Sequence, residues 1–264
     1  MPLMELAPDL KIHYLDIQPD ARFAVILLHG LGADGTSWQL QFPALTGLGF
    51  RIIAPDARGF GHSTYPPGSP AQISTAAGDF IQLASHLGIA HLDLVGISMG
   101  GAHALAFVLE CPLLVRRLVL VNTFAHLRPH GLNEWVYYAL RFMLVHTLGL
   151  EAQAKTVAAR IFPNPDQEAL RKMLIEQIMQ ADPSAYRAAM RALASFNVLE
   201  RLSEINVPTL IVTGELDTTV PRDVQQQLVE GIRGAQHVII PGAGHAVSVD
   251  QPLAFNQVLT DFLS

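Results

Sequence analysis

Short apolar runs, each ended by a turn signal, constrain this sequence more than any other feature. They lie at residues 23–28, 51–54, 92–95, 118–121, 210–213 and 237–240. Runs that are short and apolar throughout are typical of strands buried on both faces. Helical patterns alternate with them, at 73–87, 101–111, 223–232 and 253–263. This alternation predicts an α/β fold, with a mostly parallel, doubly wound sheet covered by helices on both faces.

The alternation is interrupted once, between residues 124 and 201. Only helical patterns occur there, and prolines separate them: the patterns are 134–148, 167–180 and 185–199, and the prolines are Pro163, Pro165 and Pro183. We therefore expect a helical cap inserted at 124–201, and a core assembled from residues 1–123 and 202–264. Near the start of the chain, residues 11–17 predict a strand hairpinned to 3–6.

Charge and hydropathy argue against several classes of partner. The formal net charge is −6 and no basic block stands out, so we expect no nucleic-acid partner. No apolar run is long enough to cross a bilayer, and the most apolar stretch is interrupted by Arg141 and His146. Cys111 is the only cysteine, and the chain lacks a basic start followed by an apolar run. We therefore expect a cytoplasmic protein without a disulfide, in which Cys111 is a small hydrophobe and not a nucleophile.

The strongest chemical signal is the pattern G-x-S-x-G, formed by Gly96, Ser98 and Gly100. It follows the apolar run 92–95 and precedes the helical pattern 101–111, which is the strand–turn–helix setting that the pattern requires of a nucleophile. So sharp a turn strains the backbone and needs small neighbours, which the glycines supply. The helix start beside Ser98 would also favour an oxyanion.

A second Gly-rich segment, the loop 29–32, follows the apolar run 23–28. Such a loop can present a backbone N–H to a substrate. Together with the N–H of Met99, the N–H of Leu31 would form an oxyanion hole with two donors. The plainer alternative is a tight turn in which His29 has a structural role.

A candidate acid and a candidate base follow the last two strands. Asp217 comes just after 210–213, and His245 comes after 237–240. Taken singly, a loop aspartate more often closes an Asx-turn or caps a helix, and a loop histidine more often lies at the surface. The carboxyl ends of parallel strands meet at one edge of a sheet, where open α/β sheets place their sites. We therefore predict a catalytic triad of Ser98, Asp217 and His245.

The chain resembles the α/β-hydrolase family over nearly its whole length. The order nucleophile, acid, base is the one found in that family, and residues 56–63 resemble its D-x-R-G-x-G-x-S turn. The insertion lies where the family carries a helical cap. The resemblance further implies that Asp56 and Arg58 fix a loop near the site.

These residues and the resemblance predict a serine hydrolase that cleaves carboxylic esters through an acyl-enzyme on Ser98. Asp217 would hold His245 in the right tautomer while His245 moves the proton. The expected substrate is a small-molecule ester or lactone, and no metal or cofactor is implied. An enol-lactone hydrolase of the oxoadipate type is the alternative, because residues 97–101 and 161–189 look like that subfamily. A non-catalytic binding protein of the same fold stays open as a different class.

The insertion is expected to set the choice of substrate. It carries large apolar side chains, which would favour neutral acyl groups: Trp135, Tyr138, Phe142, Met143, Phe162 and Met190. An enol-lactone instead carries a carboxylate, which would need a basic partner inside the pocket. The insertion offers five arginines for that purpose: Arg128, Arg141, Arg160, Arg187 and Arg191.

Overall fold

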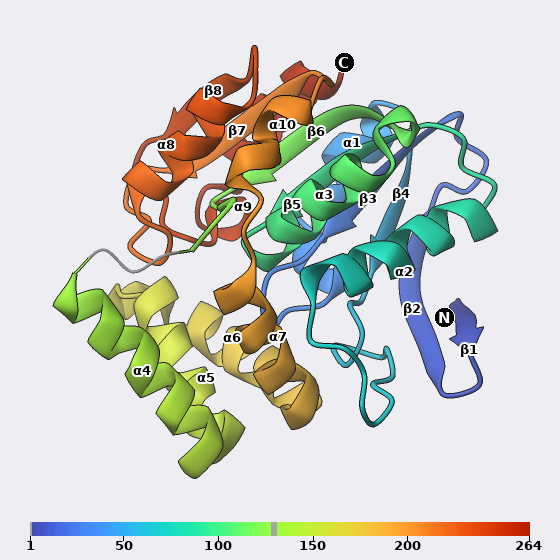
Figure 1. Cartoon of the computed structure of the whole chain (residues 1–264). Coiled ribbons are helices and arrows are strands. Elements are labelled where there is room, and N and C mark those ends of the chain that lie inside the picture. Colours follow the sequence, from blue (N-terminus) through green and yellow to red (C-terminus); the bar gives the residue numbers. More distant parts are fainter. Residues whose placement is uncertain (1, 128–130) are drawn as a thin grey trace.

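The computed structural model describes residues 2–127 and 131–264. In that part of the chain eight strands form one sheet, in the order β1-β2-β4-β3-β5-β6-β7-β8 (Figure 1). The hairpin of β1 (Leu3–Ala7) and β2 (Leu10–Ile17) is antiparallel, and β2 pairs antiparallel with β4. The other pairings are parallel, among β3 (Phe23–Leu28), β4 (Phe50–Pro55), β5 (Leu92–Ile97), β6 (Val115–Val121), β7 (Thr209–Gly214) and β8 (Gln236–Ile240). The predicted α/β architecture is confirmed.

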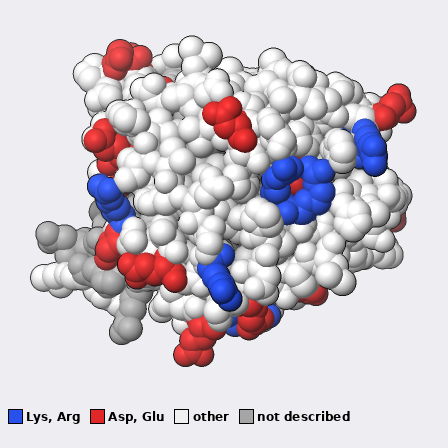
Figure 2. Space-filling model, turned by 90° about the horizontal axis from the view of Figure 1, so that it is seen from above, with Lys and Arg blue, Asp and Glu red and all other residues white. Residues whose placement is uncertain are grey.

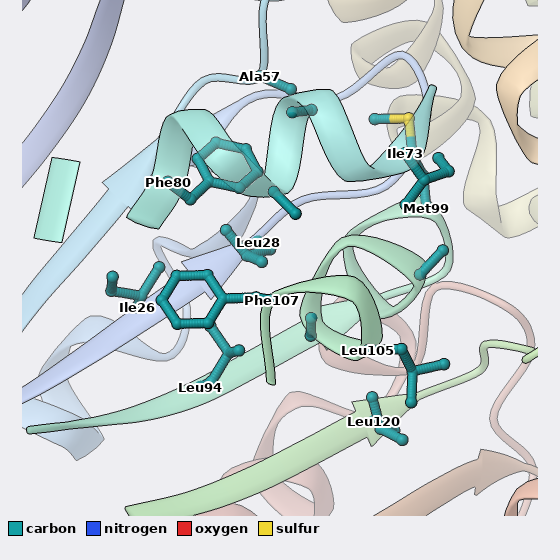
Figure 3. Packing of buried hydrophobic residues seen from close by; sticks show 14 of the residues in the cluster. Ile26, Leu28, Ala57, Ile73, Phe80, Leu94, Met99, Leu105, Phe107 and Leu120 are labelled. Carbon is teal, nitrogen blue, oxygen red and sulfur yellow. The ribbon is translucent and has the colours of Figure 1, made fainter. Parts of the chain in front are cut away.

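Helices cover both faces of the sheet. On one face lie α2 (Ile73–His86), α3 (Met99–Glu110) and α8 (Arg222–Gly231), and on the other α1 (Phe42–Gly47), α9 (Val247–Asp250) and α10 (Pro252–Leu263). Strand β3 shows why its sequence is apolar throughout: Ile26 packs into the first core and Val25 into the second. Figure 3 shows Phe80 of α2 and Phe107 of α3 packed over the first face.

Between β6 and β7 the described residues form four α-helices, which make a separate layer beside the sheet (Figure 1). They are α4 (Leu132–Thr147), α5 (Gly149–Ile161), α6 (Glu168–Gln180) and α7 (Pro183–Ser195). The sequence did not predict α5. It follows α4 at once because Gly149 has a φ of 84° and turns the chain sharply. Short 3-10 helices complete the described elements, at Gly35–Trp38, Pro112–Leu114, Pro165–Gln167 and Leu199–Glu204.

The outer face of α4 is apolar and exposed. The expectation that the large apolar side chains of the insertion line a substrate pocket is therefore wrong for three of them. Trp135 is 58% exposed, Met143 53% and Phe142 43%, so these side chains do not wall an interior pocket. Phe162, in contrast, is buried. Helix α4 is apolar on more than one side, and the side that faces the protein carries Val145, which is almost completely buried. Among the described residues, no helix combines the length and apolar character needed to cross a bilayer.

Candidate active site

Ser98 lies on a sharp turn between β5 and α3. Its backbone has a φ of 54° and a ψ of −116°, a strained combination for a residue with a side chain. The flanking glycines are required by close backbone contacts. A Cβ atom at Gly96 would collide with the carbonyl group of Gly100, and one at Gly100 would collide with that of Leu28. The turn predicted from G-x-S-x-G is therefore present, and only glycine fits two residues before and two residues after Ser98.

The loop after β3 lies next to this turn. A Cβ atom on Gly30 would make an ordinary contact of 3.6 Å with the Cβ of Ser98. In the described part of the chain, the N–H groups of Leu31 and Met99 donate no hydrogen bond to another protein atom. Both donors are thus free to serve a ligand beside Ser98.

His29 has the structural role that the sequence left as an alternative. Its Nε2 accepts a hydrogen bond from the N–H of Ala57 at 2.9 Å, so the proton is on Nδ1, which donates to the carbonyl oxygen of Gly30 at 2.8 Å. The side chain is buried. His29 therefore fixes the loop that carries Leu31, and it is not available as a base.

Asp217 and His245 come together at the ends of β7 and β8. Asp217 Oδ2 lies 3.0 Å from His245 Nδ1, and both side chains are buried, at 1% and 8% exposure. Asp217 Oδ1 accepts from the N–H of Thr219 at 2.8 Å. The aspartate therefore closes an Asx-turn and contacts the histidine at the same time, so the Asx-turn does not exclude the predicted contact with His245. This contact leaves Nε2 of His245 as the nitrogen that can exchange a proton.

Asn122, at the end of β6, joins the acid loop to the histidine loop. Its Nδ2 donates to the carbonyl oxygens of Gly244 and His245 at 3.0 and 2.7 Å, and its Oδ1 accepts from the N–H of Gly214 at 2.8 Å. Asn122 has a φ of 43°, a conformation that asparagine tolerates better than most residues. Sequence analysis gave Asn122 no role, because a single asparagine after a strand carries no motif.

Thr123, the residue after Asn122, connects the end of β6 to the backbone of Ser98. Thr123 Oγ1 donates to the carbonyl oxygen of Ser98 at 2.7 Å, and the N–H of Ser98 donates to the carbonyl oxygen of Val121 at 2.9 Å. Ser98 and His245 are therefore both bonded to the segment 121–123. The end of β6 brings the three candidate residues to one edge of the sheet.

Other ionisable groups near the site are unsuited to the role of base. Burial is the main cause that lowers the pKa of His103 to about 3, so its imidazole is neutral and a poor proton acceptor. Burial also raises the pKa of Asp250, whose Oδ2 accepts from the N–H of Gly244 at 3.0 Å. Asp250 thus supports the histidine loop through the backbone.

Cys111 ends helix α3, whereas Ser98 begins it. At 1.5 Å per residue the two ends of this helix are roughly 18 Å apart. Burial, together with the charge of Glu110, raises the pKa of the Cys111 thiol and lowers its thiolate content. Both observations favour the expected role of Cys111 as a small apolar residue.

The turn that follows β4 is held by the two residues that the family resemblance singled out. Asp56 accepts from the N–H groups of Gly35 and His62, at 2.8 and 2.9 Å. Arg58 makes two parallel bonds to Asp79, at 2.7 and 2.6 Å. These contacts fix a loop beside the site, as the resemblance implied.

The described side chains show no cluster arranged for a metal or a polyanion. No group of three or more His, Cys, Asp or Glu among the described residues could hold a metal ion. On the face of the molecule drawn in Figure 2, basic side chains lie scattered among acidic ones and form no continuous patch.

Comparison with known proteins decides the family. Residues 24–252 match the model of the alpha/beta hydrolase fold family. The chain belongs to the alpha/beta hydrolase family. The order of its strands, the turn at Ser98 and the histidine after the last strand are therefore features of an alpha/beta hydrolase, and the resemblance inferred from the sequence is confirmed.

Relatives of this alpha/beta hydrolase are named for several different activities. A putative carbamate hydrolase RutD from Rhizobium rhizogenes is 31% identical over 96% of both chains. A 3-oxoadipate enol-lactonase from Acinetobacter baylyi is 29% identical over 96% of this chain and 93% of its own. Among solved structures, the enol-lactonase from Burkholderia xenovorans has a TM-score of 0.89 at 26% identity, covering 99% of each chain. A thermophilic esterase from Thermogutta terrifontis has a TM-score of 0.85 at 28% identity, covering 99% of this chain and 96% of that one.

Proposed function

We propose that this alpha/beta hydrolase is a serine hydrolase that cleaves carboxylic esters or lactones of small molecules. The observation that carries the proposal is the buried pair of Asp217 and His245, held by Asn122 at the same strand end that binds the backbone of Ser98. A serine hydroxyl needs a base, and the base needs a fixed tautomer. His245 supplies the base, and its contact with Asp217 fixes the tautomer.

The mechanism follows from ordinary acid–base chemistry. His245 Nε2 takes the proton of the Ser98 hydroxyl as its oxygen attacks the carbonyl carbon of the substrate, while Asp217 stabilises the imidazolium. The N–H groups of Leu31 and Met99 bind the tetrahedral oxyanion. His245 then gives its proton to the leaving alcohol oxygen, and the acyl group stays on Ser98. Water repeats the sequence, releasing the acid and restoring the hydroxyl.

We further propose that residues 124–201 act as the cap over this edge. Three contacts support this role. The N–H of Asp182 donates to the carbonyl oxygen of Gly59 at 2.8 Å, Gln167 Nε2 donates to Asp250 at 3.1 Å, and Arg160 donates to the carbonyl oxygen of Thr218. Helices α5, α6 and α7 therefore cover the loops around Ser98. An enol-lactone remains the second candidate substrate, favoured by the enol-lactonases of similar sequence and fold.

The proposal is tested by a fluorophosphonate probe and by hydrolysis of an aryl acetate. Wild-type protein should carry the label on Ser98 and hydrolyse the ester. Ser98→Ala should prevent labelling and lower kcat by at least about a thousandfold, because the nucleophile is lost. Ser195→Ala, which removes an exposed hydroxyl on α7, is the matched control and should keep both properties. A binding protein without turnover would show neither labelling nor hydrolysis in the wild type.

A further inference from the structure

An arginine of helix α4 faces the protein interior. Arg141 lies four residues before Val145 and three after Tyr138, on the side of α4 that is turned away from the exposed Trp135 and Met143. Val145 is 1% exposed, and Arg141 is itself largely covered. A guanidinium in such a place loses hydration and needs strong partners.

The partners of Arg141 are neutral. With its amide oxygen turned toward the guanidinium, the buried Gln153 accepts from Nε at 2.9 Å and from Nη2 at 3.0 Å. Burial lowers the pKa of the guanidinium, but neighbouring phenol groups outweigh burial and raise it; these belong to Tyr186, Tyr137 and Tyr138. Within the described residues no carboxylate lies among these partners. Gln153 fixes one edge of the guanidinium and leaves other N–H groups without a negative partner.

Tyr186 of α7 links this arginine to the loop beside Ser98. Its side chain is completely buried, and its hydroxyl lies close enough to the guanidinium of Arg141 to interact with it as an acceptor, but it donates no hydrogen bond to a described residue. The ring lies over the Gly-rich loop, where a Cβ on Gly32 would come within 3.2 Å of Cε2. A buried hydroxyl that donates to no partner is rare in folded proteins and indicates a ligand position.

A second arginine lies on the same side of the candidate site. The guanidinium of Arg160 stacks on the ring of Tyr137 at 4.0 Å, and that of Arg141 lies 5.7 Å from the same ring. Arg160 also donates to the carbonyl oxygen of Thr218, the residue after Asp217, and its buried Nε has no partner in the described chain. Two positive charges thus lie between the loop at Gly32 and the loop at Asp217.

We propose that Arg141 and the hydroxyl of Tyr186 bind a carboxylate group carried by the substrate, so that the substrates are esters or lactones of dicarboxylic acids with one free carboxylate. Guanidinium and carboxylate match in geometry and charge, and a phenol O–H supplies a further donor. Arg160 adds positive charge nearby. The inference rests on the proposed function of Ser98, because the carboxylate is bound while the other end of the molecule reacts.

This assignment replaces the expectation of a neutral acyl pocket and selects among the five arginines. Arg191 is exposed, and Arg187 donates to the hydroxyl of Ser184 at 3.2 Å. Arg128 lies outside the described residues. Arg141 is the partly buried arginine next to a buried hydroxyl that donates to no described residue, which is an arrangement suited to a bound anion.

The test compares two substrate series that differ by one charge. One series consists of the 4-nitrophenyl monoesters of succinate, glutarate and adipate, and the other of the same compounds with the free carboxylate methylated. Wild-type kcat/KM should be higher for at least one free acid than for its methyl ester. Arg141→Gln should lower kcat/KM for that acid by about 10- to 100-fold, the effect of losing a charged hydrogen bond, and change the methyl ester series by less than about threefold.

Two variants control for folding and for net charge. Arg191→Gln removes an exposed positive charge from the same set of helices and should leave both series unchanged. Tyr186→Phe removes only the hydroxyl and should reduce the preference for the acid, with KM affected more than kcat. Glutarate should inhibit hydrolysis of the neutral ester competitively, and less strongly in Arg141→Gln.

The outcomes separate this inference from the proposed function. If the wild type hydrolyses no ester of either series, the serine hydrolase proposal is wrong. If it hydrolyses the neutral series but shows no preference for any free acid, the carboxylate site is wrong. Equal losses for both series in Arg141→Gln, at an unchanged melting temperature, would likewise assign Arg141 a purely structural role and overturn the inference.

Discussion

The edge of the sheet and the helices α4–α7 are held in place in different ways. At the sheet edge, Asp217 and Asn122 are each fixed by several hydrogen bonds to backbone groups, and Ser98 is bonded through its own backbone. In the helical layer, α4 exposes a row of large apolar side chains, and Arg141 has only neutral partners.

Under the proposed function, this difference assigns the reaction to the sheet edge and the choice of substrate to the helices. Catalytic groups must stay within a fraction of an ångström of their working positions, which the backbone bonds of the sheet edge provide. A binding surface carried by helices can change its side chains without disturbing those bonds. We therefore expect substitutions at the sheet edge to lower kcat, and substitutions in α4–α7 to change specificity or have little effect.

The largest effect is expected at the acid. Asp217→Asn keeps an oxygen that can close the Asx-turn with Thr219 but removes the negative charge beside His245. In a chymotrypsin-type triad the corresponding change lowers kcat by about four orders of magnitude, a value measured on another protein. We expect a loss of similar size here, measured by steady-state hydrolysis of an aryl ester.

The control for this substitution is Asp250, a partly buried acid of the histidine loop. Asp250→Asn removes the charge of a carboxylate that bonds to the backbone of Gly244 and not to the imidazole. Its kcat should stay within about tenfold of the wild type, since that contact is only indirect. A near-normal kcat for Asp217→Asn would show that another group orients His245.

A smaller effect is expected at Asn122. Asn122→Gly removes the three side-chain bonds to the acid and histidine loops, while glycine adopts the φ of 43° without strain. We expect kcat to fall by about 10- to 100-fold through misplacement of His245, with little change in KM. The pH profile of kcat should shift as well, because the surroundings of the imidazole change.

Asn256 offers a matched comparison on the opposite face of the sheet. Its side chain, on α10, also bonds to a distant segment: to the carbonyl oxygen of Leu40 at 2.9 Å and to Gln41 at 3.0 Å. Asn256→Gly should lower the melting temperature without moving the pH profile. If both asparagine variants change the profile equally, or neither does, Asn122 has only a structural role.

The smallest effect is expected on the outer face of α4. Trp135→Ser removes a side chain that is 58% exposed, so the free energy of unfolding should change by less than about 1 kcal/mol and kcat/KM should not change. Phe162→Ala, at a side chain that is 3% exposed, should cost about 3–5 kcal/mol. Denaturant titration measures both. A loss at Trp135 as large as that at Phe162 would mean that this face is covered in solution.

Most of the sheet and the arrangement of the candidate site could be predicted from the sequence. Strands buried on both faces leave a direct signal, as the run 23–28 shows, because its residues 24–28 are buried and all of them are apolar. Ser98, Asp217 and His245 were found because each follows such a strand, and the ends of parallel strands meet.

The remaining features depend on contacts that no local pattern encodes. Asn122 bonds to groups 92 and 122 residues away, so its role exists only in the folded chain. Helix α4 is apolar on several sides, and the sequence therefore does not indicate that Arg141 faces inward while Trp135 faces out. The expectation of a neutral pocket came from that ambiguity.

The place where the helical layer joins the core has a consequence for evolution. A β-bridge pairs His126 with Asn197, and the N–H of Val198 donates to the carbonyl oxygen of Ala125 at 3.0 Å. The chain therefore leaves the core and returns to it at neighbouring points. An insertion with adjacent ends can be lengthened, shortened or exchanged without changing the distance that the core must bridge, and the closure entropy grows only with the logarithm of its length. Under the proposed function, descendants of such a gene would acquire new substrates by replacing this one module while inheriting the chemistry of the sheet edge.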